Sequence, residues 1–346
     1  MAKAIKHNVL MRNWIADEIV SGRNTGLISS FGKTFSLSRP TATRIVKQLA
    51  DENWLSVSGP SRRPVYALGK NRGIYRQYKR EVIDENLIWT RDFLPFFELS
   101  PNVKNIVQHG FTEIMNNAHD HSNGSQVSAF VEVQGEYLGI AINDDGIGIF
   151  EKIASALKLP DRRLALLELS KGKLTTDPER HSGEGIFFTS RMFDAFVIRA
   201  NGLSFEHFHT GFEDHLRELP AASGSREAGT RVFMLISLAS ARTTREVFEQ
   251  FTLDHPDDLS FNKTVVPVRL ARLGEESLVS RSQAKRLVAR FEGFRKVELD
   301  FSDVEEVGQA FADEVFRVFA RAHPEVILSA INASDYVQRM IRRVQE

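Results

Sequence analysis

The sequence contains no cysteine, which excludes disulfides, thiolate metal ligands and cysteine nucleophiles. It also lacks long hydrophobic runs, because the longest, Val232 to Ala239, is interrupted by Ser237 and is far too short to cross a bilayer. The first residues include Lys3 and Lys6 but no continuous apolar stretch. We therefore expect no secretory signal, a cytoplasmic protein and no membrane partner.

The sequence also lacks a net charge, because 45 Lys and Arg balance 45 Asp and Glu, but the charges are distributed unevenly along the chain. Residues 1–80 hold fifteen Lys and Arg against four Asp and Glu, so 30 of the 45 basic and 41 of the 45 acidic residues lie in the remainder. A basic end on an acidic body favours a contact with nucleic acid, although a solvated basic face would give the same count. The 346 residues, 42% of them hydrophobic, predict two or three folded domains.

The first seventy residues show the pattern of a small helical module. Apolar spacing, the helix-starting Ser38 with Pro40 behind it, and the turn around Gly59 predict three helices and two short strands. These elements are expected at residues 8–22, 26–35, 38–51, 54–57 and 64–68. Three helices followed by a hairpin are the plan of a winged helix-turn-helix, expected over residues 1–70.

A winged helix-turn-helix would present basic and polar side chains to DNA. The third helix would enter the major groove and the hairpin tip would reach the backbone or the minor groove. The candidate DNA-binding residues are Arg39, Thr41, Thr43, Arg44 and Lys47 on the helix, and Arg62 and Arg63 on the tip. The alternative is a winged helix that binds protein.

Three further segments follow this module. Residues 71–105 are basic and polar at their start and are expected to be a connecting segment, and residues 106–240 form an α/β segment. Residues 260–346 alternate between strand and helix patterns in the order βαβαβα, which predicts a compact domain. The expected fold class is therefore multidomain, α+β and α/β.

The α/β segment carries four short motifs in order. Glu113, Asn117 and His121 are spaced to share one face of a helix, which offers a carboxylate, an amide oxygen and an imidazole to a hydrated Mg²⁺ and its phosphates. Behind this helix come Asp144-x-Gly146-x-Gly148, then Gly183-x-Gly185, and then Gly229-Thr230.

Together these motifs resemble the GHKL superfamily of ATPases, which includes gyrase, histidine kinases and MutL. The resemblance implies a Bergerat-type α/β sandwich over residues 106–240, with ATP and Mg²⁺ as cofactors. It implies that the Asn117 side-chain oxygen binds Mg²⁺ and that Glu113 acts as the catalytic residue, which orients or deprotonates water if hydrolysis occurs. His121 is either a phosphate contact or a more distant residue.

The same resemblance assigns the adenine-binding side of the site. Asp144 would accept a hydrogen bond from the exocyclic amine of adenine, and Thr230 would support that contact. Gly146 and Gly148 would leave room for the ring. Gly183 and Gly185 would open a helix whose free N–H groups meet phosphate oxygens. Residues 151–182 would form a mobile lid, in which Lys171, Lys173 or Arg180 could reach the γ-phosphate.

The C-terminal segment resembles a STAS-like domain of unknown function. The stretch Asp300-Phe301-Ser302-Asp303-Val304 and the helix from Gln309 carry this resemblance. Antagonists of anti-sigma factors, which share the STAS fold, have a phosphorylatable Ser or Thr just before that helix, where this chain has Gly308. A regulatory phosphoserine is therefore not expected, and an unknown protein partner is.

We therefore expect a transcriptional regulator that binds DNA through the winged helix, uses ATP·Mg²⁺ as a switch and recognises a partner through the STAS-like domain. Hydrolysis, if it occurs, would be slow. One alternative is an anti-sigma-type serine/threonine protein kinase. A third possibility is a degenerate ATPase fold that serves as a scaffold. A histidine kinase is disfavoured because residues 70–105 contain no phosphoacceptor histidine. The sequence leaves the oligomeric state open, a homodimer included.

Overall fold

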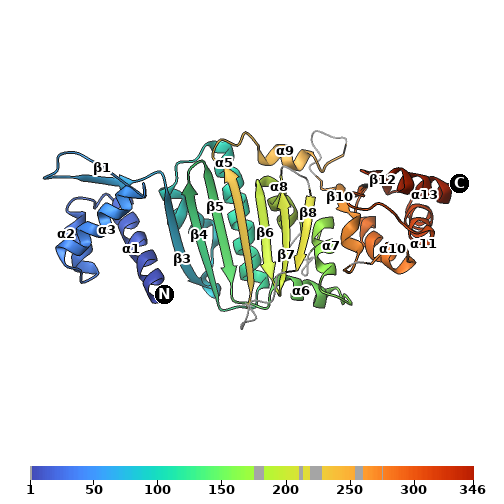
Figure 1. Cartoon of the computed structure of the whole chain (residues 1–346), viewed down its shortest axis with the longest axis horizontal. Helices are drawn as coiled ribbons and strands as arrows, with labels where there is room; N and C mark the ends of the chain where they lie inside the picture. The colour runs from blue at the N-terminus through green and yellow to red at the C-terminus, as the bar shows by residue number, and fades with distance from the viewer. Residues whose placement is uncertain (1, 175–182, 210–212, 219–227, 254–259, 275) are drawn as a thin grey trace. The chain divides into compact units, whose positions relative to one another are not determined.

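Figure 1 shows the chain as a computed structural model. Its contacts divide it into two compact units. The structure describes residues 2–174, 183–209, 213–218, 228–253, 260–274 and 276–346. The first unit comprises Met1–Asp145 and Arg231–Ala241, and the second comprises Gly146–Thr230 and Arg242–Glu346. The segment predicted as one ATP-binding domain, residues 106–240, is thus shared between the two units. No helix in the described part of the chain is long and apolar enough to cross a membrane.

The first unit combines a helical N-terminal module with an antiparallel sheet. Its elements are α1 (Ala2–Val20), α2 (Leu27–Thr34), α3 (Arg39–Asp51), β1 (Leu55–Ser58), β2 (Val65–Leu68), β3 (Arg72–Lys79), α4 (Glu85–Ile88), α5 (Pro101–His121), β4 (Gln126–Gln134), β5 (Tyr137–Asp144) and β9 (Thr230–Ser237).

The N-terminal module has the three helices and the hairpin expected from the sequence. Ser38 starts α3 as predicted, because its hydroxyl accepts a hydrogen bond from the backbone N–H of Thr41. The helical spacing of Ile45, Val46 and Leu49 predicts that they pack inward, and Val46 and Leu49 are buried while Ile45 is half-buried. β1 and β2 pair antiparallel.

The prediction of a connecting segment over residues 71–105 is wrong for its first part. Residues Arg72–Lys79 form strand β3, which pairs antiparallel with β4 over its whole length. The sequence signal for this strand is weak, because Ile74 is its one fully buried apolar side chain and the basic residues around it are typical of a linker. Two of those basic residues lie on aromatic rings, Arg72 over Phe97 and Arg76 over Phe96.

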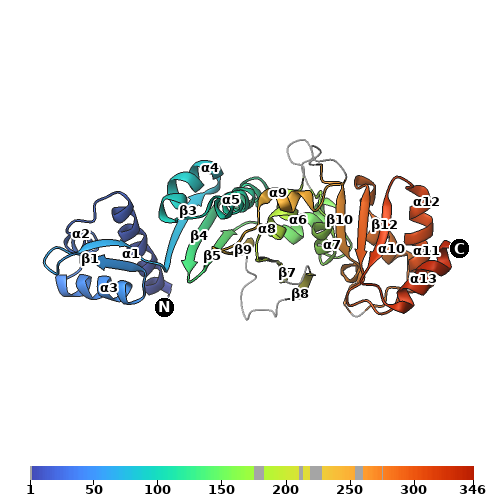
Figure 2. The same cartoon turned by 90° about the horizontal axis from the view of Figure 1, so that it is seen from above.

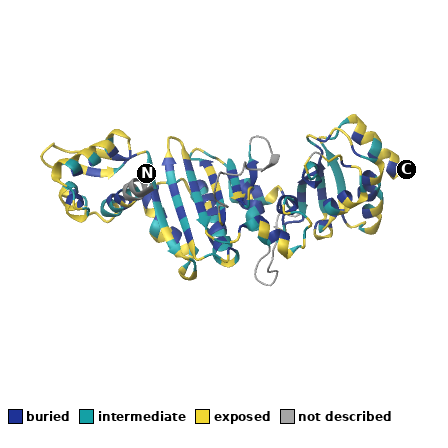
Figure 3. Ribbon diagram, turned by 60° about the horizontal axis from the view of Figure 1, so that its bottom comes forward, coloured by how far each residue is buried: buried dark blue, intermediate teal, exposed yellow. Residues whose placement is uncertain are grey.

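Helix α5 covers one face of this sheet, as Figure 2 shows. β3, β4, β5 and β9 are neighbours in that order and are antiparallel. β4, β5 and β9 alternate buried and more exposed residues, visible as bands in Figure 3, because successive side chains point to opposite faces. The buried residues of α5, such as Val107, Phe111 and Ile114, recur at helical spacing and pack towards β4 and β5.

Helix α1 is tied to β3 through one amide side chain. Asn13 donates to the backbone carbonyl of Tyr75 at 2.5 Å and accepts from the Tyr75 N–H at 3.1 Å. A single side chain thus satisfies both backbone groups of one strand residue. Arg76 adds an ion pair to Asp17 of the same helix at 2.5 Å.

The second unit contains two further strand sets. Its elements are α6 (Ile149–Ala156), α7 (Leu164–Lys171), α8 (Gly185–Met192), β6 (Ala195–Ala200), β7 (Leu203–Phe208), β8 (Glu213–Glu218), α9 (Thr244–Glu249), β10 (Lys263–Pro267), α10 (Arg281–Val288), β11 (Lys296–Asp300), α11 (Gln309–Asp313), α12 (Ala320–Ala322), β12 (Ile327–Ile331) and α13 (Asp335–Gln345). β6, β7 and β8 are neighbours and antiparallel, whereas β10, β11 and β12 form a parallel sheet.

The parallel sheet confirms the strand and helix order predicted for the C-terminal segment. The strands predicted at residues 265–270, 297–301 and 326–330 overlap β10, β11 and β12, with boundaries that differ by one to three residues. The helix that starts at Gln309 continues through a π-helical turn at Glu314–Phe319 into α12. The chain is therefore a mixed α+β protein with antiparallel sheets and a C-terminal parallel βαβ region.

The clamp between α1 and β3 gives a first testable prediction. Asn13→Ala leaves both backbone groups of Tyr75 without this partner, so we expect the free energy of unfolding to fall by about 1–3 kcal/mol in urea denaturation. Asn105, an exposed residue of α5, serves as the control. Asn105→Ala should change the same quantity by no more than about 0.5 kcal/mol. Equal effects of the two substitutions would contradict the clamp.

Candidate functional site

The predicted site residues divide between the two units. Glu113, Asn117, His121 and Asp144 belong to the first unit. The glycines Gly146, Gly148, Gly183 and Gly185 belong to the second, together with Thr230. Each half has its own local geometry.

The polar face of α5 has the spacing expected from the sequence. Glu113, Asn117 and His121 all lie within this helix and are half-buried, next to the fully buried residues that hold the helix on the sheet. The rigid packing of Ile114, Met115 and Ala118 therefore fixes the direction in which these three polar groups leave the helix. His119 lies elsewhere on the helix surface and contacts Asp120 at 3.0 Å.

Two aspartates, Asp144 and Asp145, stand at the end of β5. Asp145 accepts hydrogen bonds from the backbone N–H groups of Gln126 at 2.9 Å and Ser125 at 2.7 Å, and from the Ser125 hydroxyl at 2.7 Å. These bonds lower the pKa of Asp145 and fix the start of β4 to the end of β5. Asp144 is the last residue of β5 and is half-buried. Asp144 is the residue to which the resemblance assigns the contact with adenine.

The glycine loop behind Asp144 is held by a residue that the sequence analysis missed. Gly148 has φ 85° and precedes α6, and a Cβ there would lie 2.3 Å from the side-chain oxygen of Asn201. Asn201 donates to the Ile147 carbonyl at 2.9 Å and accepts from the Glu151 N–H at 3.2 Å. Its side chain thus occupies the space that the missing Cβ leaves. The Asn201-Gly202 pair signals a hairpin turn, but nothing local signals this contact.

Thr230 supports the same loop. Its hydroxyl accepts a hydrogen bond from the backbone N–H of Ile149 at 3.1 Å. Ile149 is the first residue of α6, so its N–H has no partner within the helix. The structure therefore brings Thr230 and the Gly146–Gly148 loop together, and the support of Thr230 for a contact between Asp144 and adenine stays a prediction.

Gly183 and Gly185 lie at the start of α8 as predicted, and Gly183 is tightly packed. Gly183 has φ 73°, and a Cβ there would lie 2.4 Å from the backbone of Leu174. Its carbonyl accepts from the Leu174 N–H at 2.9 Å. Glu184 precedes the helix without capping it through its side chain.

The predicted lid, residues 151–182, differs from expectation over α7. All eight residues of this helix are buried, so this part is not an exposed flap. Residues 175–182, with Arg180 among them, lie outside the described residues. The amine of Lys173 is already engaged and is not available to a γ-phosphate. It donates to the Gly293 carbonyl at 2.8 Å and lies over the ring of Phe294.

Lys171 is the centre of a buried polar network within the second unit. Its amine is fully buried and contacts a Glu168 oxygen at 2.7 Å and the carbonyls of Arg286 and Ala289 at 2.9 and 3.0 Å. Arg290 binds the other Glu168 oxygen at 2.7 Å. Burial lowers the pKa of Lys171 to about 8, although Glu168 opposes this shift. Lys171 thus joins α7 to the C-terminal end of α10 and is not available to a γ-phosphate.

The basic N-terminal residues have the exposure that nucleic-acid binding needs. Arg39, Arg44, Lys47 and the tip residues Arg62 and Arg63 are all exposed. The two threonines are less suited, since Thr43 donates its hydroxyl to the Arg39 carbonyl at 2.9 Å and the hydroxyls of Thr41 and Ser38 bond to each other at 2.9 Å.

Groups of three or more His, Asp and Glu that could hold a metal ion are not found among the residues that the structure describes. Mg²⁺ bound with a nucleotide does not require such a group, because it keeps several waters and takes most other ligands from phosphates. One amide oxygen, as on Asn117, is compatible with that chemistry.

The buried amine of Lys171 gives a pH-dependent prediction. The folded protein binds this proton with a pKa of about 8 and the unfolded chain with 10.5, so between these values the unfolded state holds more protons. The free energy of unfolding of the wild type should therefore rise relative to Lys171→Met across this window, by about 1.4 kcal/mol per pH unit at most, and stay level below it. Urea denaturation of both proteins over a pH series measures the difference.

Lys285→Met is the matched control, because the side chain of Lys285 is 69% exposed. Its difference from the wild type should not change over the same pH range. A difference between wild type and Lys171→Met that is also constant would contradict the buried, weakly basic amine.

Comparison with known families identifies one part of the chain. Residues 283–338 match the model of the STAS-like domain of unknown function (DUF4325), a region that runs from α10 into α13. No curated protein matches the chain. The C-terminal part of the second unit is therefore a STAS-like domain.

Proposed function

We propose that this protein is an ATP·Mg²⁺-dependent transcriptional regulator. In this proposal the N-terminal module is a winged helix-turn-helix that binds double-stranded DNA, the central segment is a GHKL-type ATP-binding domain, and the STAS-like domain binds a protein partner. The observation that carries the nucleotide part is the turn from Asp144 to Gly148, where a strand ends in a half-buried aspartate and passes into a glycine loop. Thr230 and Asn201 hold that loop.

The polar face of α5 supplies the second argument for a nucleotide. Asn117 offers an amide oxygen for Mg²⁺, and His121, one turn later, would contact a phosphate. Bound ATP·Mg²⁺ would supply a γ-phosphate that can order protein segments, and hydrolysis would remove it. Glu113, one turn before Asn117, is the residue that would hold or deprotonate an attacking water.

A route from the glycine loop to the STAS-like domain lies within the second unit. α6 begins directly behind Gly148, packs on α7, and α7 packs on β10. Lys171 then ties α7 to the end of α10. A change at the glycine loop would therefore reach the STAS-like domain through buried contacts and not through a flexible linker.

The proposal for DNA rests on charge and exposure. The basic excess of residues 1–80 includes exposed residues on one helix, Arg39, Arg44 and Lys47, and on the hairpin tip. A helix of this kind, with Val46 and Leu49 buried behind it, has the form that enters a major groove.

The nucleotide site is tested by two substitutions and one control. Asp144→Asn and Asn117→Ala should each weaken ATP·Mg²⁺ binding at least about a hundredfold, since each removes a specific polar contact worth about 3 kcal/mol. Asn105→Ala, on an exposed part of the same helix α5, should bind as the wild type does. Isothermal titration calorimetry measures the affinity, and circular dichroism checks that each variant is folded. Unchanged ATP affinity in both site variants would refute the nucleotide site.

The DNA contact is tested by a double substitution on α3. Arg44→Ala with Lys47→Ala should weaken DNA binding and reduce the slope of log affinity against log salt by about 2, because two phosphate contacts are lost. Lys158→Ala with Arg162→Ala, two exposed residues of the second unit, removes the same charge and should leave the slope unchanged. Mobility-shift titrations with and without ATP·Mg²⁺ provide both measurements.

Two outcomes would redirect this proposal. Binding to DNA that ignores the α3 substitutions would indicate that the module binds protein. Radiolabelled phosphate transferred from ATP to a partner protein, and lost in Glu113→Ala, would favour the serine/threonine kinase.

A further inference from the structure

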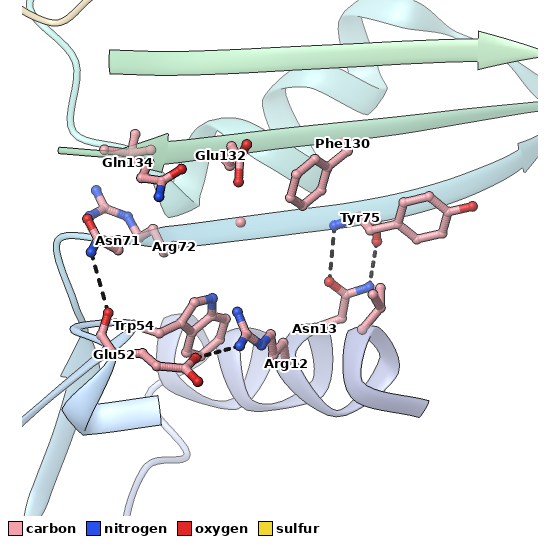
Figure 4. A pocket seen from close by; sticks show the side chains of 13 residues that line it. Arg12, Asn13, Glu52, Trp54, Asn71, Arg72, Tyr75, Phe130, Glu132 and Gln134 are labelled. Carbon is pink, nitrogen blue, oxygen red and sulfur yellow. Dashed lines mark hydrogen bonds and ion pairs between the residues drawn. The ribbon is translucent and has the colours of Figure 1, made fainter. Parts of the chain in front are cut away.

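A pocket of about 500 Å³ lies inside the first unit, between the N-terminal module and the strands β3 and β4 (Figure 4). Pockets that bind small molecules have roughly 300–1,000 Å³. None of the motifs of the proposed nucleotide site lines it. Its lining includes two aromatic rings, two carboxylates, one arginine and one glycine that matter here: Trp54, Phe130, Glu52, Glu132, Arg12 and Gly73.

Trp54 contributes an unused hydrogen-bond donor. Its residue is only 3% exposed, and within the described structure its indole nitrogen is buried without a hydrogen-bond partner. Figure 4 shows this nitrogen on the side of the ring that faces β3. A buried N–H without a partner destabilises the folded protein, and an indole can only donate. A ligand with an acceptor atom would satisfy it.

Glu132 contributes a carboxyl group with no cation beside it. The group is half-buried, and burial raises its pKa. Among the described residues no ion pair or hydrogen bond involves its side chain. The two arginines of the pocket are otherwise engaged, Arg12 with Glu52 at 2.6 Å and Arg72 with the carbonyls of Phe96 and Gly69 at 2.6 and 2.7 Å. A hydrogen-bond donor on a ligand would stabilise this half-buried carboxyl group.

The walls of the pocket are flat. Gly73 lies directly opposite Glu132 in the β3–β4 register, and a Cβ on Gly73 would come within 2.8 Å of the Phe130 ring. The glycine therefore lets this ring lie close against the strand. On the other side, the guanidinium of Arg12 lies 5.8 Å from the centre of the Trp54 ring. Two such walls favour a planar ligand.

We propose that this pocket binds a planar nitrogen heterocycle with an exocyclic amine, as a free base or nucleoside. A ring nitrogen or carbonyl oxygen of the ligand would accept from the indole of Trp54, and the amine would donate to Glu132. The ring would lie on Phe130. Phosphorylated forms would bind more weakly, because no cation among the described residues pairs with Glu132 and Arg12 is already paired with Glu52. This site is independent of the proposed ATP site.

The position of the pocket gives such a ligand a consequence within the first unit. Arg12 and Trp54 belong to the N-terminal module, whereas Phe130 and Glu132 belong to β4. A bound heterocycle would contact both and would add to the link that Asn13 makes between α1 and β3.

Heteronuclear NMR of the full-length, nitrogen-labelled protein tests the proposal. The probes are cytosine, guanosine and 2-aminobenzimidazole, each at up to about 5 mM, which detects millimolar affinity. At least one probe should move the indole N–H signal of Trp54, identified by its loss in Trp54→Phe, and leave those of Trp14 and Trp89 in place. Cytidine monophosphate should bind at least about tenfold more weakly than cytosine or guanosine.

Glu132→Gln should weaken binding of the active probe by about tenfold or more, because a charge-assisted hydrogen bond is lost. Glu136→Gln, at the exposed turn of the same hairpin, is the matched control and should bind as the wild type does. A Trp54 signal that no probe moves, or equal affinities of wild type and Glu132→Gln, would overturn the proposal. ATP affinity measured on the same samples separates this outcome from failure of the nucleotide site.

Discussion

The buried ammonium of Lys171 is the constraint on which the second unit depends. Such a group is stable away from water only when a counter-charge and carbonyls surround it, and here Glu168 and the backbone carbonyls of Arg286 and Ala289 provide them. Arg290 binds the other oxygen of Glu168 and so holds that carboxylate in place. Replacing any partner would leave a charge uncompensated, so α7 and the STAS-like domain are held in one arrangement. Gly172, directly behind Lys171, packs so closely against the Phe261 ring that a Cβ there would not fit.

In the turn behind β5, side chains from distant segments make the hydrogen bonds that local residues do not. Gly148 precedes α6 but has no side chain with which to cap it. Thr230 and Asn201 supply the missing acceptors to the first turn of the helix. Asp145 fixes the end of β5 to the start of β4 through its bonds to Ser125 and Gln126. The loop is therefore shaped by three separate parts of the sequence.

Much of this fold could be predicted from local patterns. The strands and helices of the C-terminal domain and the capping of α3 by Ser38 follow from periodicity and turn chemistry alone. β3 could not be predicted, because only Ile74 shows the apolar signal of a strand and its basic neighbours are explained by rings that lie far along the chain. The site motifs were visible, but Asn201 and the burial of Lys171 were not, since both depend on contacts between residues distant in sequence.

The two hydrogen bonds between Asn13 and Tyr75 have a further consequence for association between molecules. β3 stands at one end of its sheet, where a strand exposes a row of unpaired backbone groups that can recruit strands from other molecules. Asn13 occupies the groups of Tyr75 in the middle of that row. Two of the backbone groups with which β3 could pair with a strand of another molecule are thereby already occupied.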